Sequence, residues 1–185
     1  MQYYDYYSYR PGYMYPMMPH DQYMMTPRDQ YSYPYNLPMA LQLIRQAVAG
    51  EREDEMFYDY LLNTAPSEED KNIIRGIRDD EKKHFGLFRQ IYYELTGQMI
   101  PPPPKTEFTK PKSYCMGLKR ALKGELGAVE KYRKILFALQ ERRQINILTE
   151  IITDELRHGN LYNLLYSKNE CYEEELEKEK EEKED

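Results

Sequence analysis

The chain has 185 residues and a formal net charge of −6, and 31% of its residues are charged, which suits one folded domain with further segments at its ends. This mildly acidic balance gives no reason to expect binding to nucleic acid or to an anionic membrane. The sequence contains neither an apolar run of the roughly 20 residues that cross a membrane nor a Cys-x-x-Cys pair of the kind that holds iron–sulfur centres.

The two ends of the chain differ in composition from the middle. Residues 1–38 hold 11 of the 20 tyrosines and 6 of the 12 prolines but almost no aliphatic residue, so we expect a disordered tail. Residues 169–185 are mostly acidic and predict a second, solvated tail. A folded domain over residues 39–168 remains between them. We expect Cys115 on a helix face in this domain and Cys171 as an exposed thiol beside the acidic tail.

Apolar residues recur about every 3.6 positions in four segments of the middle, which predicts four helices. The first helix begins at Pro38, a favoured first-turn residue, and continues to about residue 63. The second follows Ser67, an N-cap residue with acids directly after it, and ends at Gly97. The third and fourth helices, at about 112–139 and 141–168, are joined by a tight turn.

The segment between the second and third helices, residues 98–111, contains four consecutive prolines that exclude a helix. A helix of about 29 residues is roughly 43 Å long, and an extended segment of 14 residues reaches roughly 46 Å. The segment can therefore return along the whole bundle, so that the second and third helices run parallel. This predicts an all-α four-helix bundle with one long, proline-rich crossover.

The second pair of helices repeats the first. Residues 47–92 align with residues 121–166 without a gap, at an offset of 74 positions. The identities include Gly50/Gly124, Glu51/Glu125, Asp80/Asp154, Glu81/Glu155 and His84/His158. Such a repeat predicts a duplicated helical hairpin whose equivalent residues occupy equivalent places in the fold.

The repeated acids and histidines have the spacing of metal ligands. In each repeat a Glu and a His lie three residues apart and share one helix face, and a further Glu comes from the preceding helix. Four Glu and two His that face the interior form a site for two metal ions, and these donors suit iron or manganese better than copper(I) or structural zinc. The predicted ligands are Glu51, Glu81, His84, Glu125, Glu155 and His158.

Two further pairs of residues are candidates for supporting roles. Asp80 and Asp154 precede the histidines by four residues, and metal-bound imidazoles usually donate their other N–H to a carboxylate. Tyr58 and Tyr132 follow the single Glu of their helices by two turns. We expect these tyrosines either to hydrogen-bond a ligand carboxylate or carry an electron, or else to be ordinary core residues.

With these motifs, residues 40–168 resemble a ferritin-like di-metal domain of the rubrerythrin type. The resemblance implies the six ligands given above and a cofactor of two iron ions, with manganese as the alternative. Rubrerythrins typically have another carboxylate three residues after the Glu of the third helix, where this chain has Ala128. Asp54 stands at the symmetric place in the first helix and is expected to supply an extra oxygen beside the site.

The resemblance implies an oxidoreductase that acts on peroxide, dioxygen or Fe(II), in oxidant defence or iron handling. Because the rubredoxin module is missing, a peroxidase would need an external electron donor protein. A di-manganese catalase is a second enzymatic interpretation. The tyrosine-rich leader is reminiscent of spore coat proteins, so the alternative is an assembly protein whose metal site only stabilises the bundle. We expect a homodimer or larger homo-oligomer, and, because the first residues lack a signal-peptide pattern, a cytoplasmic or, in the alternative, spore-associated location.

Overall fold

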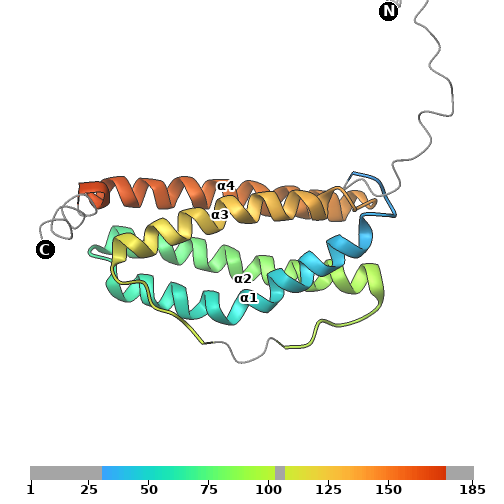
Figure 1. Ribbon diagram of the computed structural model, residues 1–185, viewed down its shortest axis with the longest axis horizontal. Coiled ribbons are helices and arrows are strands. Elements are labelled where there is room, and N and C mark those ends of the chain that lie inside the picture. Colours follow the sequence, from blue (N-terminus) through green and yellow to red (C-terminus); the bar gives the residue numbers. More distant parts are fainter. Residues whose placement is uncertain (1–30, 103–106, 174–185) are drawn as a thin grey trace, which may run out of the picture.

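The computed structural model describes residues 31–102 and 107–173 of the chain (Figure 1). Every regular element in these ranges is a helix, which confirms the predicted all-α class. None of these helices is long and apolar enough to cross a lipid bilayer. The helices are α1 (Leu37–Thr64), α2 (Glu68–Thr96), α3 (Tyr114–Leu136) and α4 (Arg142–Lys168).

Local sequence signals set several of the helix ends. At the start of α2 the side chain of Ser67 accepts a hydrogen bond from the backbone N–H of Asp70, and at its end Gly97 has a left-handed conformation with φ of 69°. Ser113 caps α3 in the same way, by accepting from the N–H of Met116. This cap places the start of α3 two residues later than the expected position 112.

The four helices form a bundle in which α1 and α4 each pack against both α2 and α3. Figure 1 shows α2 and α3 running in the same direction, with the described parts of the crossover at opposite ends of the bundle. The crossover contacts α1 through Phe108, whose ring centroid lies 6.3 Å from those of Phe57 and Tyr60. The predicted bundle with one long return segment is therefore the observed arrangement.

The apolar core consists of two clusters, one toward each end of the bundle. Along α2 the buried face changes from Ile77 in one cluster to Phe88 in the other, and Glu81 and His84 lie between them. Along α4, Glu155 and His158 also lie between the two clusters, but in the opposite order, with Ile151 in the cluster of Phe88 and Tyr162 in that of Ile77. A buried polar layer thus crosses the middle of the bundle.

The boundaries of the two predicted tails differ from those of the fold. Two residues before α1 contact the bundle: the ring of Tyr31 lies 4.9 Å from that of Phe137, and buried Asn36 donates from Nδ2 to the Phe137 carbonyl over 3.0 Å. The folded part therefore begins before residue 39, because these two side chains find partners on it. The remaining parts of the two predicted tails, 1–30 and 174–185, lie outside the described residues.

The prediction of an exposed Cys171 is wrong. Cys171 is fully buried and forms a disulfide with Cys115, which lies in the first turn of α3. The sequence separation of 56 residues hid the pair, because only the folded bundle brings the end of α4 beside the start of α3. The disulfide covalently closes one end of the bundle.

Candidate metal site

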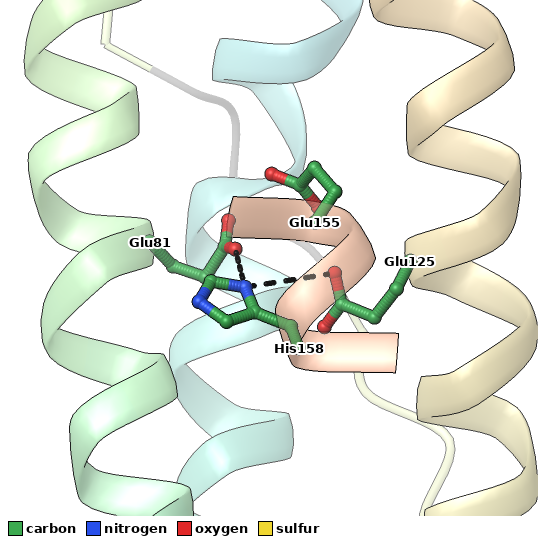
Figure 2. A group of neighbouring side chains, drawn as sticks. All are labelled: Glu81, Glu125, Glu155 and His158. Atoms are coloured by element: carbon green, nitrogen blue, oxygen red, sulfur yellow. Dashed lines mark ion pairs between the residues drawn. The ribbon is translucent and has the colours of Figure 1, made fainter. Parts of the chain in front are cut away.

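Three helices bring carboxylates and a histidine to one point in the polar layer (Figure 2). Glu81 comes from α2, Glu125 from α3, and Glu155 and His158 from α4. One donor atom from each of these four residues lies within 4.8 Å of the others, and all four residues are buried. Four of the six ligands predicted from the repeat are therefore adjacent.

The two histidines face the carboxylates of both repeats. His84 Nδ1 lies 3.2 Å from Glu155 Oε1 and 3.5 Å from Glu81 Oε1. His158 Nδ1 lies 3.0 Å from Glu81 Oε1 and 3.9 Å from Glu125 Oε2. The imidazole rings are stacked, with their centroids 5.9 Å apart. His84 thus joins the cluster as the fifth predicted ligand, and the two repeats build one site together.

The outer nitrogens of the histidines are held by aspartates of the opposite repeat. His84 Nε2 lies 3.1 Å from Asp154, and His158 Nε2 lies 3.2 Å from Asp80. With the Nε2 protons directed to these carboxylates, the Nδ1 lone pairs face the site. The expected positions of both aspartates beside the histidines agree with this geometry.

Arg157 was not predicted as part of this arrangement. Its guanidinium donates to Asp80 and to Asp154 over 2.7 Å each, so it joins the two aspartates behind the histidines. The aligned position of the first repeat is Lys83, which pairs with Glu150 instead. Comparison of the repeats therefore gave no signal for Arg157.

Four oxygen and nitrogen atoms that could bind a metal ion at this point form no hydrogen bond within the described ranges. These are Oε1 of Glu81 and of Glu155 and Nδ1 of His84 and of His158, all of them buried. Leaving a buried polar atom unsatisfied costs about 1–3 kcal/mol, and more where the group is charged. A set of unsatisfied oxygens and imidazole nitrogens directed at one point fits a pair of metal ions, which would coordinate them.

Burial and neighbouring charges shift the pKa values of two groups in this layer, Glu125 and His84. Burial raises the pKa of Glu125, and the neighbouring carboxylates of Glu155 and Glu81 raise it further. Burial alone would lower the pKa of His84, but its contacts with Glu155 and Glu81 raise it to about 10. Metal binding requires the deprotonated forms of these groups, so metal ions and protons compete for the site.

The structure does not bring Glu51, the sixth predicted ligand, to this cluster. Its carboxylate is paired with Arg89 of α2, and 25% of its side chain is exposed. Asp54, one turn further along α1, lines a 290 Å³ cavity together with Glu81, Glu125 and Glu155. Burial, followed by the charge of Glu81, raises the pKa of Asp54 to about 7. The ligand role of Glu51 stays a prediction.

Tyr58 and Tyr132 line the same cavity and are buried. Burial and the nearby carboxylates hold the pKa of both phenols well above the ordinary value, so both keep their O–H protons. Arg120 also lines the cavity, donating to Glu53 over 2.6 Å and to the carbonyl of Thr109 in the crossover over 3.0 Å. The cavity is therefore lined mainly by α1 and α3, together with Glu81 of α2 and Glu155 of α4, and Arg120 of α3 links it to the crossover.

Comparison with known proteins agrees with this geometry. The model of the rubrerythrin family matches residues 42–166. The chain belongs to the rubrerythrin family. Membership of this family indicates a di-iron carboxylate protein, and the Glu and His cluster is compatible with such a centre.

Two relatives of this rubrerythrin-family chain each match 69% of its length. The uncharacterized protein YhjR of Bacillus subtilis (strain 168) is 28% identical over 132 residues, which cover 69% of this chain and 90% of that protein. A solved structure of a hypothetical protein from Pyrococcus furiosus has a TM-score of 0.56 and 23% identity, and covers 69% of this chain and 86% of its own. The second comparison establishes the fold alone.

Proposed function

We propose that this protein is a non-haem di-metal oxidoreductase that uses two iron ions, or manganese, to act on peroxide, dioxygen or Fe(II). The observation that carries the proposal is the convergence of buried, unsatisfied donor atoms from both repeats at one point. The three buried carboxylates of the cluster, Glu81, Glu125 and Glu155, would repel one another or bind protons in the absence of cations. Such a cluster lowers the stability of the fold, and bound metal ions would offset this cost by neutralising the carboxylates.

The chain's own residues have distinct roles in this proposal. The residues that would hold the metal ions are Glu81, His84, Glu125, Glu155 and His158. Glu81 would have the central role among them, because its Oε1 faces Nδ1 of both histidines, at 3.0 and 3.5 Å. Bound metal ions would supply redox electrons and Lewis acidity. The cross-repeat aspartates keep both imidazoles in the tautomer that binds a metal ion.

The cavity between α1 and α3 is the place for a small substrate. Its volume of 290 Å³ is enough for peroxide or dioxygen together with water. Tyr58 and Tyr132 line it as protonated phenols, each able to donate a hydrogen bond to an oxygen of the substrate or of a ligand carboxylate. We assign them this positioning role, with electron transfer as the alternative.

Reaction of the reduced, loaded protein with oxidants tests the proposal. Protein loaded anaerobically with Fe(II) is mixed with peroxide or with air-saturated buffer in a stopped-flow spectrometer, and the experiment is repeated with Mn(II). We expect oxidation faster than that of the free metal ion, and little reaction in the Glu155→Ala variant. Equal rates for wild type, variant and free ion would contradict the proposal and favour a metal site that only stabilises the bundle.

The source of electrons is a further prediction of this proposal. The 185 residues contain no Cys-x-x-Cys pair that could hold a rubredoxin-type iron, so we expect this polypeptide to need an external donor protein for a peroxidase cycle. We expect NADH oxidation by peroxide in the presence of the loaded protein only after a rubredoxin and its reductase are added. Sustained turnover with NADH and this polypeptide alone would contradict the prediction.

The assembly interpretation remains the second candidate. The described residues just before α1 include two tyrosines, Tyr33 and Tyr35, that are 48% and 53% exposed. In this interpretation such exposed tyrosines take part in contacts between copies or in oxidative cross-linking. Deletion of residues 1–35 distinguishes the two functions: a smaller oligomer with unchanged redox activity assigns assembly to this segment, and unchanged oligomer size without peroxide cross-links argues against it.

A further inference from the structure

We infer that α1 contributes Asp54, not Glu51, to the metal centre, so that each of the four helices supplies one carboxylate and the two repeats are used asymmetrically. This inference rests on the metal binding proposed above and assigns the α1 ligand within it. The four carboxylates are Asp54, Glu81, Glu125 and Glu155, which line one cavity.

The first argument is that Glu51 already has a partner of its own. Its carboxylate is paired with the guanidinium of Arg89 on α2, and the two side chains are 25% and 28% exposed. Removing one member of a largely buried ion pair leaves the other charge without compensation, which is costly. In the second repeat the position aligned with Arg89 is Asn163, which carries no charge to withdraw Glu125 from the site.

The second argument is that Asp54 occupies the place beside the cluster. It lines the cavity with the three glutamates, and Glu51 does not. The aligned residue of the second repeat is Ala128, so α1 has an acid at the position where α3 has none.

The charges agree with this assignment. Asp54 and the three glutamates provide four negative charges, which two divalent cations neutralise when both histidines are neutral. Glu51 and Arg89 neutralise each other outside the cluster. Adding Glu51 to the ligands would leave Arg89 as a partly buried, uncompensated cation.

Anaerobic titration of the wild type, Asp54→Asn and Glu51→Gln with Fe(II) and with Mn(II) tests the inference. Both substitutions keep the side-chain shape, and circular dichroism of the metal-free proteins checks that they fold alike. We expect Asp54→Asn to lower the binding affinity for at least one of the two metal ions by about tenfold or more. The rise in melting temperature on metal addition should also be smaller than in the wild type. Glu51→Gln should bind two metals with affinities within about twofold of the wild type.

Three results would overturn the assignment: loss of metal in Glu51→Gln alone, loss in both variants, or loss in neither. Failure of the proposed redox function has a different signature. In that case the wild type binds two metals and does not react with peroxide or dioxygen, and the comparison of the two variants still identifies the α1 ligand.

Discussion

Each histidine of the site is oriented by an aspartate from the other repeat. Asp154 of α4 faces His84 of α2, Asp80 of α2 faces His158 of α4, and Arg157 bridges the two aspartates. These contacts fix the tautomers and at the same time join α2 to α4 next to the buried carboxylates. Ligand orientation and helix packing therefore depend on the same side chains.

Replacement of Asp154 by Asn should weaken metal binding without removing a ligand. A neutral amide replaces the charged carboxylate that accepts a hydrogen bond from the His84 Nε2–H, and Arg157 loses one of its two carboxylate partners. We expect a loss of affinity of about tenfold to hundredfold, the usual effect of removing such a carboxylate. Metal titration measures it.

Asp79→Asn is the matched control for this substitution. Asp79 lies on α2 next to the site residues, has a side chain that is 64% exposed, and forms an ion pair with Arg78. The Asp79→Asn variant should bind metal ions with the same affinity as the wild type. An Asp154→Asn variant that matched this control would show that the aspartate does not orient the ligand.

Site residues could be predicted where the sequence pattern lies within one helix, and could not be predicted where the role depends on a contact between helices. Glu81 with His84 and Glu155 with His158 were visible because ligands three residues apart share a helix face in any helix. The proposed use of Asp54 in place of Glu51 could not be predicted from the sequence, because it depends on the pairing of Glu51 with Arg89 on another helix. The signal that could have indicated it is the asymmetry of the repeats, in which Arg89 aligns with Asn163 and Asp54 with Ala128.

At the scale of helices, one end of the bundle is joined by buried Asp70. This side chain accepts hydrogen bonds from Ser67 at 2.5 Å and from Lys168 and Asn169 at 2.7 Å each, and the hydroxyl of Tyr114 lies 3.3 Å away. It therefore connects the start of α2 with the start of α3 and the end of α4.

Asp70→Asn should destabilise the bundle at neutral pH. Burial by itself raises the pKa of Asp70, but the hydrogen bonds from Lys168, Ser67 and Asn169 outweigh it and hold this pKa below the ordinary value. The ionised form is thus favoured by folding, with a contribution of about 1–3 kcal/mol that is present at neutral pH. This contribution should be lost as the pH falls from about 4, the usual unfolded value, through the lower folded pKa.

Urea denaturation at neutral and at acid pH checks this prediction. The difference in free energy of unfolding between wild type and Asp70→Asn should be largest near pH 7 and should shrink in acid. A difference that does not change with pH would mean that the charge of Asp70 does not contribute.

The Cys115–Cys171 disulfide closes the same end of the bundle. By restricting the unfolded chain, a disulfide across a separation of 56 residues contributes about 2–4 kcal/mol. We expect the double variant C115A/C171A to unfold at lower urea concentration than the oxidised wild type. Reductant should lower the wild-type midpoint and leave that of the variant unchanged. Equal midpoints for oxidised wild type and variant would contradict the prediction.

The helices and their caps could be predicted because their signals are local in the sequence. The disulfide could not be predicted because it joins residues that only the fold brings together. Ser67 and Gly97 act on backbone groups within a few residues of themselves, so the sequence alone indicates where α2 begins and ends. Cys171 finds its partner only because the turn after α4 returns to the bundle. The acidic residues that follow Cys171 suggested that it is exposed to solvent, so its pairing with Cys115 was not predicted.

At the scale of the whole molecule, the duplicated hairpins enclose a single polar layer between two apolar clusters. The repeat predicted this arrangement, because equivalent residues at an offset of 74 positions face each other when α2 and α3 run parallel. The length of the crossover limited the topology to such a bundle. The aspartate pairs that cross from one repeat to the other required the structure itself.

The central claim is that both repeats hold one shared pair of metal ions. Its most direct test is the metal content of Glu81→Ala and Glu155→Ala after anaerobic titration with Fe(II), with Asp79→Ala as the surface control. Because Glu81 faces both histidines and Glu155 faces His84 from the opposite repeat, we expect two metals per chain in the wild type and the control and close to none in either site variant. Two tightly bound ions in each site variant would contradict the shared site.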